Sequence, residues 1–291
     1  MAGKILNFGS LNIDYVYAVE HFVQAGETLS SKEMRVFPGG KGLNQSIALA
    51  RAGAQVIHGA VVGDNGDFLL QVMADSGVDI SRIQRVSGSC GHAIIQVDGA
   101  GQNCILLYAG TNHMVDRAYA EGFLADACPG DVLLLQNEVS GLRDIFELAA
   151  RKGMRIAFNP SPYHENLKKL PLSYVTWWLC NEVEGEALFG SGDPAVMAER
   201  FRQQYPHSSL ILTLGERGSM YIDGDGCITQ PAHPVAAVDT TAAGDTFTGY
   251  YLAAVAEGRA PREALERASK AASIAVSRPG AAESIPRADE L

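Results

Sequence analysis

The sequence has 291 residues, of which 47% are hydrophobic, and its formal net charge is −10 at pH 7. A chain of this length and composition can bury a large core. The negative charge argues against a nucleic-acid backbone or an anionic membrane as the main partner, because both bind basic surfaces, although it leaves room for a local positive pocket.

The N-terminal stretch, MAGKILNFGSLNID, lacks the long apolar segment of a signal peptide. No apolar run reaches the roughly 18 residues of a membrane-spanning helix. The five cysteines form no CxxC pair, which favours reduced thiols over a disulfide framework or a zinc site. We therefore expect a cytoplasmic protein.

Short β-rich runs alternate with longer segments of helical periodicity along most of the chain. This alternation predicts an α/β fold, with a mostly parallel sheet covered by helices on both faces. The expected strands are residues 4–9, 56–62, 132–136, 155–159, 175–179 and 210–214, and the expected helices are residues 43–51, 68–75, 142–151 and 194–205.

Two segments, residues 12–37 and 91–108, interrupt the alternation and contain strand-like runs without a helical face. The turn signal Asp98-Gly99 predicts a hairpin in the second segment. Together the two segments predict a small separate sheet inserted from the main lobe. No repeat or linker divides the chain, so we expect one domain over residues 1–291.

Ligands of such folds bind beyond the carboxyl ends of the strands, and the first unusual loop there is GSLNID, residues 9–14. Asn12 and Asp14 are two positions apart, so in an extended chain both side chains point the same way. An amide and a carboxylate on one face suit a polyhydroxylated ligand. An Asx-rich turn at a strand end is the simpler interpretation of this stretch taken alone.

The second loop is PGGKGLNQS, residues 38–46, which leads into a helix. Its glycine pair allows close approach of the backbone, while Lys41 and Asn44 add a charge and an amide. It is no Walker A loop, because a glycine follows the lysine where serine or threonine is required. A glycine pair before a helix is often only a turn, but the lysine between glycines favours a ligand contact.

The third loop is CNEVEGE, residues 180–186, with acidic residues at the expected start of a helix. The helix dipole usually explains such acids. The functional alternative is a magnesium ion held through water, since Mg²⁺ commonly keeps several waters and takes only one or two carboxylates.

The fourth loop lies in DTTAAGDTFTGYYLA, residues 239–253, before a helix expected over residues 246–257. The free N–H groups at a helix start, together with the dipole, can hold an anion whose charge grows during reaction. Asp245 stands at the edge of that anion site, where it can take a proton from a hydroxyl that attacks a phosphate. The stretch predicts phosphoryl transfer without a P-loop.

The pairing of GGKGLNQ with DTTAAGDTFTG resembles the ribokinase branch of the PfkB sugar-kinase family. The further segments GSLNID, DGAGQN, AGTN, NPSP, NEVEGE, TLGERG and IAVSRPGAAESIP fall in family order over nearly the whole chain. The resemblance implies a three-layer α/β/α fold, a small β-sheet lid over the sugar, and ATP-dependent phosphorylation of a sugar hydroxyl.

The resemblance also implies roles for individual residues. Asp245 matches the catalytic base, and the backbone amides that match the anion hole are those of Ala242, Ala243 and Gly244. The matching sugar-binding residues are Asn12, Asp14, Gly40, Lys41, Asn44, Ala93, Ile95, Leu107 and Glu138. The matching nucleotide-binding residues are Asn181, Thr213, Gly215, Gly218 and Ser269. Ser269 departs from the pattern, because many ribokinases carry histidine there.

Two cation sites and an assembly are implied in the same way. Glu184 matches the acid associated with Mg²⁺. A potassium site, built mostly of backbone carbonyls, would combine Asp239, Thr241, Ala275, Arg278, Gly280 and Ser284. The resemblance further implies a homodimer formed through the lid.

A free sugar is the expected acceptor, with D-ribose first. Glu138 would repel a sugar phosphate, and the lid carries few cations. The aliphatic lid residues are too small to stack a nucleobase, although Tyr15, Tyr17 and Phe37 keep a nucleoside open. Fructose, 2-deoxyribose and adenosine remain alternative acceptors.

Two other protein classes are alternatives to a kinase. A dinucleotide-binding dehydrogenase would carry GxGxxG after the first strand, where this chain has GSLNID. A sugar-binding regulator without catalysis would be expected to have lost Asp245 or the Ala-Ala-Gly segment, and both are present.

Overall fold

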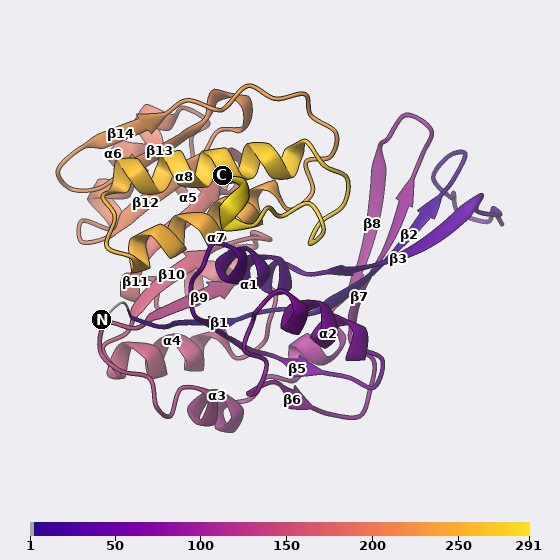
Figure 1. Ribbon diagram of the computed structural model, residues 1–291, viewed down its shortest axis with the longest axis horizontal. Coiled ribbons are helices and arrows are strands. Elements are labelled where there is room, and N and C mark those ends of the chain that lie inside the picture. The colour runs from indigo at the N-terminus through magenta and orange to yellow at the C-terminus, as the bar shows by residue number, and fades with distance from the viewer. Residues whose placement is uncertain (1–2) are drawn as a thin grey trace.

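The computed structural model describes residues 3–291, and its main body is built on an eight-stranded sheet (Figure 1). Six strands are parallel, and β13 and β14 are added antiparallel at one edge. In spatial order the strands are β14 (Cys227–Gln230), β13 (Ser219–Ile222), β12 (Ser209–Thr213), β11 (Val175–Asn181), β10 (Arg155–Asn159), β9 (Val132–Gln136), β1 (Ile5–Phe8) and β4 (Val56–Gly59).

Helices cover both faces of this sheet, as the continuous apolar strands require. In β9, Leu134 packs into one core and Leu133 and Leu135 into the other, all without solvent exposure. The first core contains α1 (Lys41–Arg51), α2 (Asp67–Asp75), α7 (Ala243–Ala256) and α8 (Pro261–Val276), and the second contains α3 (Arg117–Phe123), α4 (Leu142–Arg151), α5 (Glu182–Phe189) and α6 (Pro194–Gln204). The predicted three-layer α/β/α fold is confirmed. None of the helices among residues 3–291 has the length and apolarity to cross a membrane.

A four-stranded sheet extends away from the main body, at the right of Figure 1. Its order is β3 (Glu33–Gly39), β2 (Asn12–Ala18), β7 (Gly91–Val97) and β8 (Asn103–Tyr108), and we call it the lid sheet. The β7–β8 hairpin turns at Asp98, whose carbonyl accepts the Gly101 N–H at 3.0 Å. The two segments that interrupt the sequence pattern therefore form the small sheet predicted from them.

One expected strand, residues 56–62, is divided in two. The Ala60 N–H donates to the Tyr119 hydroxyl at 2.9 Å instead of to a neighbouring strand, while the Ala60 carbonyl accepts from that hydroxyl at 2.8 Å and from the Gln84 N–H at 2.9 Å. After this break, β5 (Val61–Val62) pairs with β6 (Gln84–Arg85). The remaining short elements are 3₁₀ helices at Gly110–Met114, Glu165–Lys169, Leu172–Tyr174, Gly215–Arg217 and Ala288–Glu290.

Glycines allow the first core's helices to approach each other and the sheet very closely. A Cβ on Gly249 of α7 would overlap the Ala48 Cβ of α1, and a Cβ on Gly42 would overlap the backbone at Ser10. Asp245 lies one helical turn before Gly249, on the same face of α7. This close contact between α1 and α7 brings Asp245 against the first turns of α1.

Candidate active site

The start of α7 presents free backbone donors to an open space. Ala242 adopts a left-handed conformation with φ of 60°, which a residue with a Cβ rarely adopts and which often marks a functional site. Among the described residues, the N–H groups of Ala242, Gly244 and Asp245 have no hydrogen-bond partner. A Cβ on Gly244 would meet no atom within 4 Å, so an anion can reach these donors.

The helix α7 begins at Ala243, whereas the sequence predicts that it begins at residue 246. The Ala-Ala-Gly segment therefore lies at and in the first turn instead of in front of it. The Ala243 N–H donates to the Thr240 carbonyl at 3.2 Å, so this amide of the predicted anion hole is already engaged. The sequence could not show this, because Ala242 reverses the chain through a conformation that glycine usually adopts.

Asp245 is 8% exposed, and two amides of α1 hold its carboxylate. Asn44 Nδ2 donates to one oxygen at 3.2 Å, and Gln45 Nε2 donates to the other at 2.8 Å. Asn44 was predicted from the sequence as a site residue, and Gln45 was not. The available signal was a polar Asn-Gln-Ser run that directly precedes the apolar run IALA in the same helix.

Lys41 brings a positive charge into this acidic surrounding. Burial by itself would lower the pKa of the Lys41 ammonium, but the negative charges of Asp245, Glu138 and Glu184 outweigh it and raise the pKa. The lysine therefore stays protonated beside the carboxylate of Asp245.

Glu138 follows β9 and closes the start of α1. Its Oε2 accepts the Lys41 N–H at 3.0 Å and also the hydroxyl of Ser10. Burial raises the pKa of Glu138, while the charge of Lys41 and these hydrogen bonds oppose the rise. Gly40, with φ of 96°, precedes α1 and has no side chain that could cap it, so Glu138 satisfies a donor that would otherwise be free.

Asp14 lies in the lid sheet, close enough to Glu138 of the main body for the two charges to interact. A Cβ on Gly39 would overlap the Asp14 carboxylate, so glycine in the neighbouring strand makes room for this side chain. Burial, and secondarily the negative charge of Glu138, raise the pKa of Asp14 to about 6.

The strand register decides which lid residues share the face of Asp14. Asp14 pairs with Ala93, which pairs with Leu107, and cross-strand partners point to the same face. Ile95, two positions beyond Ala93, lies on that face as well. Phe37 pairs with Asp14 and belongs to the same row.

Tyr15 and Tyr17 lie on the opposite face of the lid sheet, because each is an odd number of positions from Asp14. They cannot stack a base held on the Asp14 face. The sequence-based reason for keeping a nucleoside open therefore fails for both tyrosines and persists only for Phe37.

Asn12 is fixed by a residue that the sequence did not single out. Asn112 Nδ2 donates to Asn12 Oδ1 at 2.7 Å, and Asn112 Oδ1 accepts the Leu11 N–H at 3.0 Å. The contact spans 100 residues, so no local pattern could reveal it.

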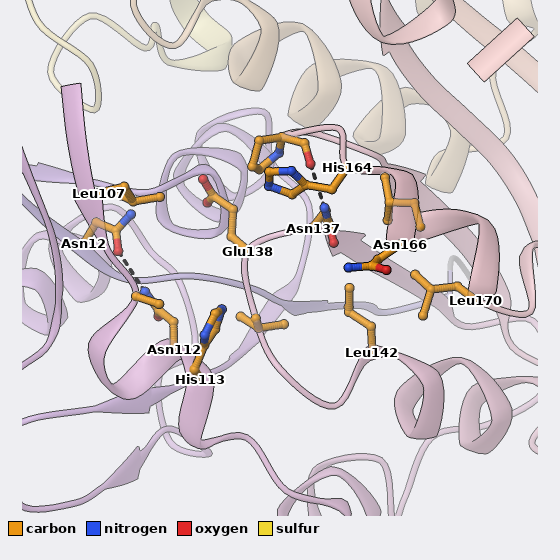
Figure 2. Close-up of a pocket in the computed structure, with 14 residues that line it drawn as sticks. Asn12, Leu107, Asn112, His113, Asn137, Glu138, Leu142, His164, Asn166 and Leu170 are labelled. Carbon is orange, nitrogen blue, oxygen red and sulfur yellow. Dashed lines mark hydrogen bonds between the residues drawn. The ribbon is translucent and has the colours of Figure 1, made fainter. Parts of the chain in front are cut away.

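A cavity of about 460 Å³ begins at Asn12, Leu107 and Glu138. It continues away from them toward Asn137 and His164 (Figure 2). Its far end is lined by Leu142, Asn166, Leu167 and Leu170. The predicted sugar-binding residues line only one end of this cavity, which extends beyond them.

Asn181 and Glu184 form the N-terminal cap of α5. The Glu184 N–H donates to Asn181 Oδ1 at 2.9 Å, and the Asn181 N–H donates to Glu184 Oε2 at 2.9 Å. Asn181 Nδ2 donates to the remaining oxygen, Oε1, at 3.1 Å. Both oxygens of Glu184 are thus engaged, and a magnesium ion near it is best served through water.

The predicted nucleotide residues lie around the ends of β11 and β12. Thr213 closes β12, and its hydroxyl donates to the Cys180 carbonyl at 3.4 Å. The turn that follows ends at Gly218, where φ is 94°. Gly215 opens this turn at φ of 56°. Ser269 of α8 is buried, with its hydroxyl 3.5 Å from that of Ser219.

The structure brings Asp239 to the C-terminal segment predicted to share its cation site. The Asp239 carboxylate accepts the Thr241 N–H at 2.9 Å and the Gly280 N–H at 3.0 Å. Burial raises the pKa of Asp239, but these hydrogen bonds outweigh it and the net shift is downward.

The other residues of the predicted cation site are partly engaged with one another. The Ala275 carbonyl accepts the Arg278 N–H at 3.0 Å. The Ser284 hydroxyl donates to the Ala281 carbonyl at 2.8 Å. Among residues 3–291, no group of three His, Cys, Asp or Glu side chains could hold a metal ion.

Comparison with known proteins agrees with this geometry. The profile of the pfkB family carbohydrate kinases matches residues 2–288. A ribokinase from Haemophilus influenzae is 33% identical over 291 residues, covering 97% of this chain and 95% of the relative.

Two solved structures have the same fold. A Cryptococcus neoformans ribokinase in complex with ADP superimposes with a TM-score of 0.88 at 30% identity, covering 99% of this chain and 98% of that one. An Arabidopsis thaliana ribokinase complexed with ribose and ATP gives a TM-score of 0.87 at 27% identity, with coverage of 99% and 97%. The chain belongs to the pfkB family of carbohydrate kinases.

Proposed function

We propose that this protein transfers the γ-phosphate of ATP to a hydroxyl of a free sugar, with D-ribose as the preferred acceptor and ribose 5-phosphate as the product. One observation carries the proposal: the buried Asp245 carboxylate lies beside the free N–H groups at the start of α7. Relatives named ribokinase, including one complexed with ribose and ATP, support the choice of acceptor.

In the proposed reaction, Asp245 accepts the proton of the attacking hydroxyl. The hydroxyl oxygen forms a bond to the γ-phosphorus while the bond to the ADP oxygen breaks, and ADP leaves with that electron pair. The N–H groups of Ala242 and Gly244 stabilise the charge on the transferring group. The Ala243 N–H contributes only after it leaves the Thr240 carbonyl.

The sugar is held between the lid sheet and the start of α1. Asn12 and Asp14 supply acceptors from the lid, while Asn44, Glu138 and the backbone at Gly40 supply polar groups from the main body. Lys41 adds a charge, and the aliphatic residues of the lid, Ala93, Ile95 and Leu107, cover the apolar side of the sugar.

ATP is proposed to bind along the ends of β11 and β12, near Asn181, Thr213, Gly215, Gly218 and Ser269. A bound Mg²⁺ would supply positive charge against the charge that develops on the phosphates. Glu184 suits a role through water, because its two oxygens cap α5. The protein's own contribution is to hold the phosphates against the start of α7.

A nucleoside is the second candidate acceptor, and the observation that favours it is the cavity that extends from Glu138 to Leu170. Release of ADP from ATP and Mg²⁺ should be measured with ribose, 2-deoxyribose, fructose, adenosine and fructose 6-phosphate. The proposal expects the highest kcat/KM for ribose. Preference for adenosine would identify a nucleoside kinase, and no ADP release with any acceptor would favour a regulator.

Sugar binding is expected to weaken as the pH falls through about 6. The pKa of Asp14 is raised to about 6, so the carboxylate becomes protonated there and loses an acceptor for the sugar hydroxyls. KM for the sugar should be measured between pH 5 and 8, alongside the variant Asp14→Asn. The wild-type KM should rise at the acid end, whereas the variant should show a flat profile in this range. Parallel profiles would contradict the assignment.

The raised pKa of Asp14 affects the stability of the fold in the opposite sense, favouring low pH. Because the folded value lies above the ordinary 3.8, protonated Asp14 stabilises the fold at low pH. That contribution is lost as the pH rises through about 6.

Activation by a monovalent cation is a further expected result. Potassium bound by carbonyls near Asp239, Thr241, Ala275, Arg278, Gly280 and Ser284 would hold the loop that carries the anion-binding N–H groups. We expect kcat to fall when potassium is replaced by sodium or tetramethylammonium at constant ionic strength. The variant Asp239→Ala should be slow in all three salts. A wild-type rate that ignores the replacement would refute the site without affecting the kinase assignment.

A homodimer formed through the lid sheet is proposed on the basis of its exposed apolar side chains. These are Met34, Val36, Ile94, Ile105, Leu106, Leu107 and Tyr108. We also propose a cytoplasmic location, in keeping with the unpaired cysteines.

A further inference from the structure

A chain of buried amides leads from Asp245 into the centre of the main sheet. Gln45 Nε2 donates to Asp245 Oδ1 at 2.8 Å, and Gln45 Oε1 accepts from Gln136 Nε2 at 2.7 Å. Gln136 Nε2 also donates to Asn7 Oδ1 at 3.0 Å. Gln45, Gln136 and Asn7 have no solvent exposure. The chain of amides lies between α1 and the sheet, beside the buried polar side chains of Ser46 and His58.

In this chain of amides, each side chain's neighbour determines which way its oxygen and its NH₂ group point. Asn7 Nδ2 donates to the Gly42 carbonyl and to Ser46 Oγ, both at 2.8 Å, so its oxygen must face Gln136. Gln136 turns its NH₂ group toward that oxygen, and Gln45 therefore turns its own oxygen toward Gln136. As a result, the NH₂ group of Gln45 faces the Asp245 carboxylate.

This arrangement is unfavourable as packing alone. Polar groups buried among apolar side chains cost free energy unless they are fully hydrogen-bonded. Gln136 Oε1 has no partner among the described residues, nor has His58 Nε2, although His58 Nδ1 contacts Ser46 Oγ at 2.8 Å. Apolar side chains would fill the same space without these unsatisfied atoms, so the amides point to a role at Asp245.

We propose that Gln45, oriented by Gln136 and Asn7, is a positioning residue for Asp245. Its NH₂ group holds Oδ1 at 2.8 Å and so fixes the orientation in which the carboxylate can accept a proton as a general base. A rotated Gln45 would present its own oxygen to the carboxylate and repel it, and the Gly42 carbonyl anchors the chain against that rotation. The inference deepens the proposed function, since it rests on Asp245 as the base.

Two substitutions of Gln45 separate this role from simple packing. Gln45→Met keeps the length of the side chain and removes the donor, whereas Gln45→Glu places a second carboxyl beside the first. When kcat is plotted against pH, the acid limb is the range in which kcat rises with pH. In both variants this limb should move to higher pH, by about one pH unit for Gln45→Met and further for Gln45→Glu. At the optimum, kcat should fall about 10- to 100-fold because the base is less well oriented.

The effect should weaken along the chain of amides. Gln136→Met leaves Gln45 without its orienting donor, so the acid limb should move in the same direction by a smaller amount. In all of these variants KM for the sugar and for ATP should stay within about three-fold of wild type, because none of them removes a proposed binding residue.

Asn159→Leu is the matched control. Asn159 is a buried amide on the next strand, and its Nδ2 donates to the Leu179 carbonyl at 2.7 Å without contacting Asp245. The variant should lower Tm as Gln45→Met does and leave the acid limb in place. If Gln45→Met lowers Tm and its acid limb also stays in place, the glutamine is only a packing residue and the inference is wrong.

Titration of the Asp245 carboxyl by ¹³C NMR, assigned with Asp245→Asn, gives an answer that does not depend on turnover. Its midpoint should move to higher pH in Gln45→Met relative to wild type and to Asn159→Leu. A wild-type protein that phosphorylates no acceptor would refute the proposed function, while the titration would still decide the role of Gln45. An unchanged midpoint in folded Gln45→Met would overturn the inference.

Discussion

Replacing Asp245 by asparagine is expected to abolish most turnover while sugar binding persists. The amide keeps the shape of the side chain but cannot accept the proton of the attacking hydroxyl. Positioned general bases contribute about 10²–10⁴-fold, so kcat should fall by that factor. Steady-state kinetics and a direct measurement of sugar affinity check the two parts of this result.

Thr246→Val is a suitable control for this variant. Thr246 is the next residue in α7, and its buried hydroxyl has no partner among the described residues. The substitution changes the same helical turn without removing the proposed base, so kcat should stay close to wild type. If Asp245→Asn retained more than about a tenth of wild-type kcat, the fall in kcat would be smaller than a positioned general base contributes. Asp245 would then not be that base.

Replacing Asp14 by alanine is expected to weaken sugar binding selectively. A hydroxyl left unpaired in a buried site costs roughly 1–3 kcal/mol. KM for the sugar should therefore rise by about one to two orders of magnitude, by the same estimate, while KM for ATP stays nearly constant. Both constants are obtained from initial rates at saturating concentrations of the other substrate.

The neighbouring glycine provides an independent check of the Asp14 result. Gly39→Ala would introduce a Cβ into the space of the Asp14 carboxylate and displace it without removing the charge. This variant should raise KM for the sugar in the same direction as Asp14→Ala. Equal rises of the sugar and ATP constants in Asp14→Ala would indicate a folding defect in place of a lost contact.

The main sheet could be predicted closely because burial on both faces leaves a clear signal. The strands Val132–Gln136 and Arg155–Asn159 have the predicted bounds, since each contains a continuous apolar run, VLLL in the first and IAF in the second. The lid sheet could be recognised because its segments interrupt the helical alternation and contain the Asp98-Gly99 turn. In these cases local composition and tertiary environment favour the same structure.

The start of α7 could not be predicted from the same signals. Periodicity places a helix where apolar residues recur, and the Ala-Ala-Gly segment contributes no such pattern. Its helical conformation depends on Ala242 in the left-handed region, which sequence rules assign to glycine or asparagine. The difference matters, because it decides which amides are free to bind an anion.

The surroundings of Asp245 were the least predictable part of the site. Gln45 and Asp245 are 200 residues apart, and no local pattern relates them. A glutamine in a helix is ordinarily a solvent-facing residue. It points inward here because Gly249 allows α7 to lie directly against α1. Tyr15 and Tyr17 illustrate the converse, since they face away from Asp14 only because residues 12–18 form one strand, in which successive side chains alternate between the two faces.

The most direct test of phosphoryl transfer to a free sugar is ³¹P NMR of wild-type protein with ribose, ATP and Mg²⁺. The proposed function predicts a new phosphomonoester signal coupled to the protons of the ribose primary carbon, together with one ADP for each ester. Appearance of inorganic phosphate without a sugar ester, or an unchanged ATP spectrum at high protein concentration, would contradict it.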